Sequence, residues 1–390
     1  MLNTAFEPWP SFTQEEADAV SKVLLSNKVN YWTGQECRAF EKEFAQFVGT
    51  KHAVAVANGT VALDVALKAL GIGTGDDVIV TSRTFLASAS SIVTAGANPV
   101  FADVELDSQD ISHRTIEAVL TQNTKAIICV HLAGWMCDMD PIMQLAEEKG
   151  LYVIEDCAQA HGAMYKGKSA GSIGHIGAWS FCQDKIMTTG GEGGMVTTND
   201  EVLWKKMWSY KDHGKNYDSV YNKQHPPGFR WLHDSFGTNW RMMEMQAVIG
   251  RIQLKKMPEW TAVRNANMAR IQAAFENSPY FTVAKPSADY VHAAYKCYVQ
   301  VNVDALPEAW SRDRIMAEIN ALGVPCFSGS CSEVYLEKAF EGTPWCPAQR
   351  LQNAQQLGES SLMFVVHPTL SEQSLQKSVD VIQQVIARIA

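Results

Sequence analysis

One lysine stands where its amine could do chemistry. Lys185 lies within "SFCQDKIMTTGGEGG", five residues after the end of a short apolar run and five before a glycine cluster that begins at Gly190. A lysine becomes a nucleophile that forms a Schiff base when it is partly removed from water and its pKa falls. Most lysines in polar loops are solvated charges instead. The assignment of Lys185 therefore depends on the residues around it.

Two further polar groups fall where predicted strands end. Asp156 closes the apolar run 151–155, and "NGT" (58–60) connects another apolar run to a helical pattern. A helix N-terminus offers free N–H groups and the positive end of a dipole to an anion, and a glycine allows close approach of the backbone. Thr60 by itself could be a plain helix cap. Asp156 by itself could cap a helix, bind a metal or pair with a protonated ring nitrogen.

Together these groups match the chemical handles of one cofactor. Gly59 and Thr60 would bind a phosphate, Asp156 would pair with a pyridinium nitrogen, and Lys185 would bind an aldehyde. Pyridoxal 5'-phosphate (PLP) presents all three. The chain lacks a Walker A loop and a GxGxxG after its first strand, so other nucleotide-binding chemistry has little support. No metal site is expected, because the nearby His161 has no further ligands at a recognisable spacing.

The elements that must position these residues show an α/β pattern up to about residue 200. The predicted strands are 52–57, 76–81, 98–104, 125–131 and 151–156. Near-continuous apolar strands separated by helical patterns indicate a mostly parallel sheet sandwiched by helices. Ligands bind to such sheets outside the carboxyl ends of the strands. The "NGT" turn and Asp156 both fall at that edge.

The pattern changes after about residue 250. A long helical stretch over 242–275 is expected to be interrupted once, at Pro258, and the strand-like "KCYVQVNV" (296–303) and two helical segments follow. A chain of 390 residues is long for a single core. We therefore predict a large domain with N-terminal helices and the αβα sheet over 1–250, and a smaller α+β domain over 251–390.

Composition and charge exclude several classes of protein. The chain is 46% apolar and 19% charged, as in an ordinary globular protein. A net charge of -9 argues against nucleic acid or an anionic membrane as a partner. No apolar run approaches the ~18 residues needed to span a bilayer, and the N-terminal residues lack a secretory pattern. Nine cysteines without a CxxC pair fit reduced thiols. The expected location is the cytoplasm.

Six motifs between residue 55 and about residue 250 carry a resemblance to a known family. They read "VANGTVAL", "TFLASASSI", "IEDCAQAHGA", "WSFCQDK....GGEGGMVTTND", "KDHGK" and "TNWRMMEMQAVIG". In this order they resemble the PLP-dependent sugar aminotransferases of the DegT/DnrJ/EryC1/StrS type. The resemblance implies the fold-type-I architecture of aspartate aminotransferase.

The resemblance also implies roles for individual residues. Lys185 corresponds to the lysine that binds the cofactor covalently and then moves the proton, whereas a histidine there would mark the sugar dehydratases. Asp156 corresponds to the acid at the pyridine nitrogen and Gln159 to the side chain near the phenolic oxygen. Phe85 falls where an aromatic ring stacks on the cofactor.

Four more residues match the positions that bind the cofactor's phosphate. They are Gly59, Thr60, Ser180 and Asn239. In the family the asparagine reaches the phosphate of the neighbouring subunit. The resemblance therefore implies a homodimer with shared active sites.

Two features depart from the family pattern. Gly190 adds one glycine before "GEGG", which would reshape that turn without moving Lys185. The segment 324–335 reads "VPCFSGSCSEVY" where many relatives show a "HYxPLH"-like segment lining the sugar site. That segment has no cation, and Arg230 and Arg241 are the candidates for an anion clamp elsewhere. The nature of the sugar is left open by these departures.

The expected function is transfer of an amine from L-glutamate to a keto-sugar for surface polysaccharide or lipopolysaccharide biosynthesis. The default substrate is a nucleotide-linked keto-deoxyhexose. One alternative is a free 8-keto-3-deoxy-octulosonate, which would give 8-amino-3,8-dideoxy-octulosonate. Alternatives of another class are a PLP-binding regulatory protein without turnover and a nucleotide-binding enzyme without PLP.

Overall fold

A seven-stranded sheet forms the centre of the structure, a computed structural model that describes residues 6–389. The strands follow the order β1-β9-β8-β5-β4-β2-β3. Their bounds are β1 His52–Val56, β2 Asp77–Thr81, β3 Asn98–Ala102, β4 Thr124–Val130, β5 Tyr152–Asp156, β8 Ile176–Ser180 and β9 Gly194–Thr198. All neighbouring pairs are parallel except those of β9, which is antiparallel to β8 and to β1. The predicted mostly parallel sheet is confirmed.

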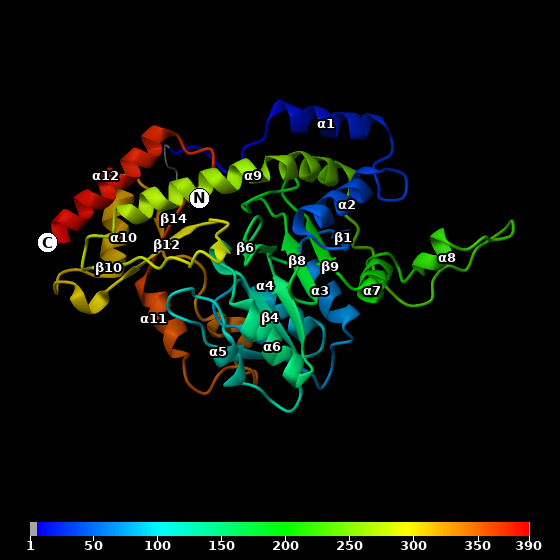
Figure 1. Ribbon diagram of the computed structural model, residues 1–390, viewed down its shortest axis with the longest axis horizontal. Coiled ribbons are helices and arrows are strands. Elements are labelled where there is room, and N and C mark those ends of the chain that lie inside the picture. Colours follow the sequence, from blue (N-terminus) through cyan, green and yellow to red (C-terminus); the bar gives the residue numbers. More distant parts are fainter. Residues whose placement is uncertain (1–5, 390) are drawn as a thin grey trace.

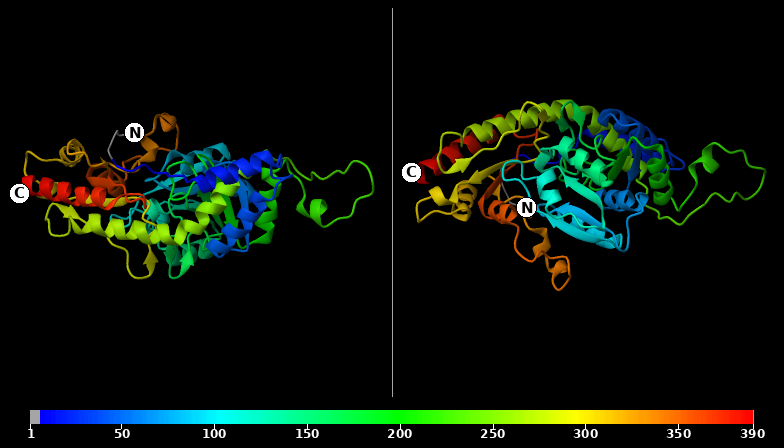
Figure 2. Two further views of the ribbon diagram at one scale, coloured as in Figure 1. Left: turned by 90° about the horizontal axis from the view of Figure 1, so that it is seen from above. Right: turned by 60° about the horizontal axis from the view of Figure 1, so that its bottom comes forward.

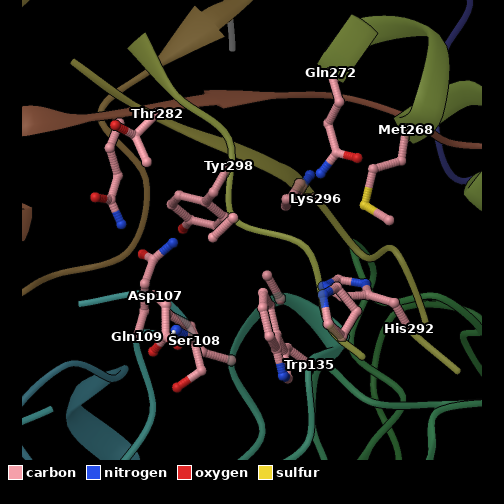
Figure 3. A pocket seen from close by; sticks show the side chains of 15 residues that line it. Asp107, Ser108, Gln109, Trp135, Met268, Gln272, Thr282, His292, Lys296 and Tyr298 are labelled. Carbon is pink, nitrogen blue, oxygen red and sulfur yellow. Dashed lines mark hydrogen bonds between the residues drawn. The ribbon is translucent and has the colours of Figure 1, made fainter. Parts of the chain in front are cut away.

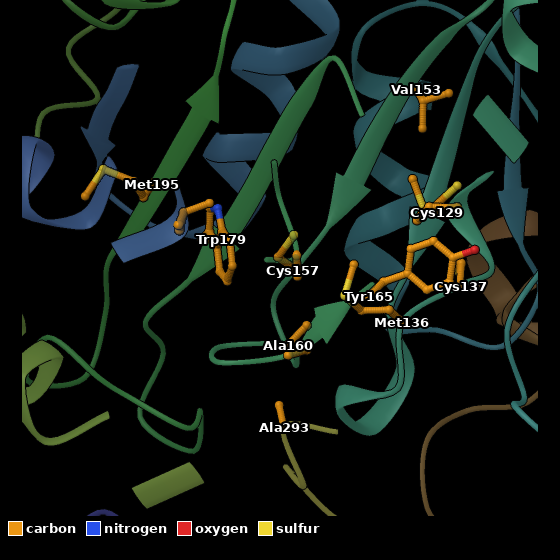
Figure 4. Packing of buried hydrophobic residues seen from close by; sticks show 14 of the residues in the cluster. Cys129, Met136, Cys137, Val153, Cys157, Ala160, Tyr165, Trp179, Met195 and Ala293 are labelled. Atoms are coloured by element: carbon orange, nitrogen blue, oxygen red, sulfur yellow. The ribbon is translucent and has the colours of Figure 1, made fainter. Parts of the chain in front are cut away.

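Helices bury both faces of this sheet, which explains its continuous apolar strands. Ile79 of β2 belongs to one apolar cluster, whereas its neighbours Val78 and Val80 belong to the other. The first face is covered by α2 Glu36–Val48, α5 His113–Glu117, α6 Met139–Lys149 and part of α9 Glu244–Ala273. The second is covered by α3 Gly59–Ala69, α4 Leu86–Thr94 and α7 Glu201–Lys211. Figure 4 shows part of the first cluster, with Trp179 and Met195 beside Cys157.

A second, smaller sheet lies beyond the C-terminal half of α9. It is antiparallel, in the order β10-β12-β14-β13. Its strands are β10 Phe281–Thr282, β12 Cys297–Val301, β13 Cys326–Phe327 and β14 Ser361–Phe364. Helices α10 Arg312–Ala321 and α12 Glu372–Ile389 lie beside it (Figure 1). Side chains of both helices belong to the same apolar cluster as those of the sheet. The division into two domains at residue 250 stays a prediction, and that residue lies inside α9.

Helix α9 is continuous, so the interruption expected at Pro258 is wrong. The helix runs from Glu244 to Ala273 with Pro258 inside it. A proline removes one helical hydrogen bond and costs about 3 kcal/mol in a helix interior. Pro258 lies on the exposed face, while Leu254 and Met257 are buried in the first apolar cluster. Tertiary packing therefore overrides the local penalty.

The remaining elements are short or peripheral. They comprise helices α1 Gln14–Leu25, α8 Tyr217–Tyr221 and α11 Gln352–Ser360, the 3-10 turns η1 Leu132–Gly134, η2 Val303–Ala305, η3 Val334–Leu336 and η4 Lys338–Phe340, and a small sheet of β11 Tyr290–Val291, β6 Met164–Tyr165 and β7 Lys168–Ser169. No helix within residues 6–389 combines the length and apolar character that crossing a membrane requires.

One segment extends away from the body of the protein. Residues 217–236, which begin with α8, project as an arm in both views of Figure 2. The arm carries aromatic side chains that are largely exposed, Phe229 at 78%, Trp231 at 83% and Phe236 at 99%. Large apolar side chains gathered in this way usually mark a contact with another protein surface.

Candidate active site

A pocket of about 630 Å³ lies at the carboxyl ends of β1, β5 and β8. Seven of the eight residues proposed from the sequence line it: Gly59, Thr60, Phe85, Asp156, Gln159, Ser180 and Lys185. The eighth, Asn239, is exposed and is not part of the lining. Parallel strands end at one edge of the sheet, which is why residues 126 positions apart in the chain come together here.

At one end of the pocket the N-terminus of α3 meets Ser180. Asn58 caps this helix, its side chain accepting from the Val61 N–H at 2.9 Å. The hydroxyl of Thr60 is therefore not needed as a cap and makes no hydrogen bond among the described residues. A Cβ on residue 59 would lie 2.5 Å from Ser180 Cβ, so only glycine allows this approach. Free N–H groups and two hydroxyls converge as a cradle for an anion.

Asp156 is held at the base of the pocket by two hydrogen bonds. Its Oδ2 accepts from Ser88 Oγ at 2.8 Å and its Oδ1 from the Ala158 N–H at 3.1 Å. Burial raises the pKa of Asp156, while the hydrogen bond from Ser88 and that from Ala158 act in the opposite direction. These donors stabilise the ionised form that can pair with a cationic ring nitrogen.

Ser88 is a site residue that the sequence did not single out. Its hydroxyl lies 2.8 Å from that of Thr84, and both residues line the pocket. Because the Ser88 proton is given to Asp156, Ser88 accepts from Thr84. The two residues fall within the quoted "TFLASASSI", four positions apart, with Thr84 just before α4 and Ser88 in its first turn. That helical spacing was the available signal.

Lys185 lies next to an acid and an aromatic ring. Its Nζ is 3.1 Å from Asp184 Oδ1 and 5.4 Å from the centre of the Tyr295 ring. The Tyr295 hydroxyl donates to the other oxygen of Asp184. The carbonyl of Lys185 accepts from Trp9 Nε1 at 2.8 Å, which holds the backbone. The lysine side chain is 17% exposed, so its amine remains accessible from the pocket.

Gln159 and Phe85 complete the walls. Gln159 Oε1 accepts from the Ala133 N–H at 2.8 Å, so its amide N–H₂ is left free to donate. Phe85 occupies the N-cap position of α4 without a capping hydrogen bond, and its side chain is 72% exposed at the rim of the pocket. An exposed ring beside a pocket is suited to stacking on a flat ligand.

The other polar residues considered from the sequence lie outside this pocket. Arg241 and Lys215 both pair with the buried Asp212, at 2.8 and 2.7 Å. Arg230 is exposed on the arm. His161 packs between Trp179 and Phe181, and burial lowers its pKa to about 3. Its position in the apolar core agrees with a structural role.

The pocket fits the groups that PLP presents. The cradle at the start of α3 suits a phosphate, the ionised Asp156 suits the ring nitrogen, and the free amide of Gln159 suits the phenolic oxygen. Lys185 lies in the same lining.

Comparisons with known proteins give consistent findings. A model of the DegT/DnrJ/EryC1/StrS aminotransferase family matches residues 10–383. The GDP-perosamine synthase of Caulobacter vibrioides is 36% identical over 381 residues, with 97% of each chain covered. The dTDP-3-amino-3,4,6-trideoxy-alpha-D-glucose transaminase of Streptomyces venezuelae is 31% identical, with 100% of this chain and 96% of that one covered. The crystal structure of an aminotransferase from Psychrobacter cryohalolentis is similar at 66% identity and a TM-score of 0.98, covering 98% of this chain and 99% of that one.

Proposed function

From the premise that the chain belongs to the DegT/DnrJ/EryC1/StrS aminotransferase family, we propose that it transfers the amine of L-glutamate to a nucleotide-linked keto-deoxyhexose. The chain is a PLP-dependent aminotransferase with the fold-type-I architecture. The observation that carries the proposal is the convergence of Lys185, Asp156 and the α3 cradle in one pocket. A regulatory protein without turnover is not retained, because the matching family model is one of aminotransferases and Lys185 lines the pocket.

The residues of the pocket divide the work between binding and proton transfer. PLP, when bound, supplies an aldehyde that accepts the donor's amine and a ring that withdraws electrons from the donor's α-carbon. Thr60, Ser180 and the N–H groups around Gly59 hold the phosphate. Asp156 keeps the proton on the ring nitrogen. Gln159 orients the ring through its phenolic oxygen.

Lys185 moves the proton that the reaction requires. With the cofactor bound, its Nζ would take the proton from the donor's α-carbon and hold it for return, and hydrolysis by a water molecule, which gives the keto oxygen, would release 2-oxoglutarate while the amine is retained for the sugar. Asp184, at 3.1 Å, stabilises the ammonium form between these steps. Tyr295, hydrogen-bonded to Asp184, limits where that carboxylate can turn. The keto-sugar then receives the amine by the reverse path.

The relatives support a nucleotide-linked substrate. Two of them are named for GDP-linked and dTDP-linked amino-sugar chemistry. A free sugar acid such as 8-keto-3-deoxy-octulosonate needs a carboxylate clamp. Arg241, one of the two candidates for this clamp, already pairs with Asp212, and it shares that carboxylate with Lys215. The pathway is proposed to supply surface polysaccharide or lipopolysaccharide, in the cytoplasm.

A homodimer with shared sites is the second part of the proposal. The exposed aromatic side chains of the arm need a covering surface, and a second copy of the chain provides one. Asn239 follows the arm and lies two residues before Arg241. The backbone of Arg241 forms an isolated antiparallel β-bridge with Val56, near the cradle. The asparagine is exposed there and would reach the phosphate in the partner's site.

The reverse reaction tests the substrate. The PLP-loaded enzyme is given 2-oxoglutarate with either nucleotide-linked 4-amino-hexoses or 8-amino-3,8-dideoxy-octulosonate, and glutamate is measured. We expect glutamate from the nucleotide-linked amines. Formation of glutamate from the octulosonate amine alone would overturn the proposed substrate while leaving the aminotransferase chemistry intact.

A further inference from the structure

A small, partly open cavity lies between the loops that follow β3 and β4 and the smaller sheet. One of its lining residues, Ala133, donates its N–H to Gln159 of the active-site pocket. The volume of the cavity is about 30 Å³. Figure 3 shows Gln272 of α9 pointing from above toward Lys296, with Trp135 and His292 on the opposite side. A cavity of this size holds one or two water-sized groups, so it admits a small polar group and not a whole metabolite.

Lys296 is the cation of this cavity, and among residues 6–389 its side chain makes neither a salt bridge nor a hydrogen bond. Its Nζ lies over the face of the Tyr295 ring, 4.8 Å from the ring centre. Asp107, the acid at the cavity, is exposed and accepts from the Ser108 N–H. Burial lowers the pKa of Lys296 to about 8 and that of His292 to about 4. Near neutral pH the lysine is charged and the histidine is not.

Lys296 is also close to the catalytic lysine. The nitrogen atoms of Lys296 and Lys185 lie 4.8 and 5.4 Å from the centre of the same Tyr295 ring, which places them no more than about 10 Å apart. The acid between them, Asp184, is already engaged by Lys185 and Tyr295. The buried Arg264, with two unpartnered nitrogen atoms, adds positive charge on the same side.

An unpaired, partly buried ammonium is costly unless an anion joins it. We propose that Lys296 binds a carboxylate of the amino donor, with the rest of the donor lying in the pocket of Lys185. The ligand class is a dicarboxylic amino acid and its 2-oxo acid, and this identification rests on the proposed use of glutamate. The amide of Gln272 offers a further donor around the cavity, whereas the hydroxyl of Tyr298 already donates to Ser330 Oγ at 3.2 Å.

The first test measures binding without the reaction. Glutarate, a dicarboxylate without an amine, is titrated by calorimetry into the full chain prepared without PLP. Replacing Lys296 by Met keeps the length of the side chain and removes its charge, and should weaken glutarate binding about tenfold or more. Lys296→Arg should restore part of the affinity, and Lys125→Met, on an exposed strand end, should change nothing. Wild-type affinity in Lys296→Met would overturn the proposal.

The second test separates the two half-reactions of the PLP-loaded enzyme. Lys296→Met should slow single-turnover release of 2-oxoglutarate from glutamate and leave amine capture from an amino-sugar nucleotide without a carboxylate unchanged. Equal slowing of both would show a purely structural role and overturn the proposal. If Lys296→Met slows the half-reaction of glutamate and that of glutamine alike, the bound group is the α-carboxylate. If it slows only the half-reaction of glutamate, the bound group is the γ-carboxylate. If the wild type makes no 2-oxoglutarate but still binds glutarate through Lys296, the proposed donor fails and the anion site stands.

Discussion

At the scale of single residues, Asp156 shows how burial and hydrogen bonding compete over one charge. Burial favours the neutral acid, while Ser88 and the Ala158 N–H favour the carboxylate. The role proposed for Asp156 needs the carboxylate, since a neutral acid cannot keep a proton on the ring nitrogen. The hydroxyl of Ser88 is in turn oriented by that of Thr84. Two hydroxyl groups that take no part in the reaction therefore position the carboxylate of Asp156.

Replacing Ser88 by Ala should therefore raise the pKa of Asp156 further. A hydrogen bond to a charged group is worth about 1.5–3 kcal/mol, so we expect kcat to fall about tenfold or more. The acid limb of the pH profile should move to higher pH, because Asp156 is protonated below its pKa. Ser88→Thr, which keeps the hydroxyl, serves as the control. An unchanged acid limb in Ser88→Ala would contradict this role.

The pH dependence of donor binding belongs to Lys296. Its pKa of about 8 is lowered by burial and by the positive charges of Arg264 and Lys185, and it is raised by Asp184. His292 and Tyr295 beside it are neutral at this pH. Since only the ammonium binds a carboxylate, the KM for glutamate should rise above about pH 8. The KM for the amino-sugar nucleotide, measured in the same series, should not follow it.

At the scale of elements, the close contact between α3 and β8 creates the phosphate cradle. Gly59→Ala would place a Cβ 2.5 Å from Ser180 Cβ and force the helix N-terminus away. Overpacking of this kind costs about 1–3 kcal/mol, so PLP affinity, measured by fluorescence titration, should fall about tenfold or more. Gly73→Ala meets only an ordinary contact at 3.7 Å and serves as the control. Equal affinities of the two variants would argue against the cradle.

Helix α9 contains Pro258, and tertiary packing offsets the free-energy cost of this proline. Pro258→Ala restores a helical N–H, which favours the helix by about 3 kcal/mol, against about 1 kcal/mol of added chain entropy in the unfolded state. The melting temperature of the PLP-saturated enzyme should rise by a few degrees. Pro307→Ala, in the exposed loop before α10, should not raise it. A lower melting temperature for Pro258→Ala would show that the proline shapes the contacts of α9.

At the scale of the whole molecule, the active site is proposed to need two copies of the chain. The arm over 217–236 exposes aromatic rings, and Asn239 lies outside the pocket of its own chain. A homodimer would explain both observations, because the partner subunit would cover the exposed rings and Asn239 would enter the partner's site. The association would then control PLP binding as well as stability, because a monomer would lack one phosphate ligand.

Mixed dimers test the sharing of sites. Asn239→Ala should weaken PLP binding, and Lys185→Ala should abolish turnover without unfolding the protein. Statistical mixing of the two variants should recover about a quarter of wild-type activity, because half the dimers are mixed and each has one native site. As a reference, Lys125→Ala is mixed with Lys185→Ala. This mixture shows how activity falls when subunits with a native site are only diluted by inactive ones. No recovery from verified mixed dimers would place Asn239 in its own subunit's site or outside any site.

The sequence by itself determined the α/β pattern and the residues that come together in the pocket. Both depend on local order: apolar runs define strands, and the carboxyl ends of parallel strands must meet at one edge. Gly59, Asp156 and Lys185 could be placed together for this reason, although their roles also needed the resemblance to a family. The strand β9 was missed, because its residues follow directly on a glycine-rich turn.

Only the tertiary structure decided what surrounds these residues. Tyr295 meets Asp184 across 111 positions of the chain, and Lys296 reaches the cavity from the smaller sheet. No pattern of period 2 or 3.6 records such contacts, because they depend on how separate elements pack. The continuity of α9 through Pro258 has the same origin. The burial of the helix residues before and after Pro258 outweighs the local penalty of the proline, and burial is a property of the folded chain.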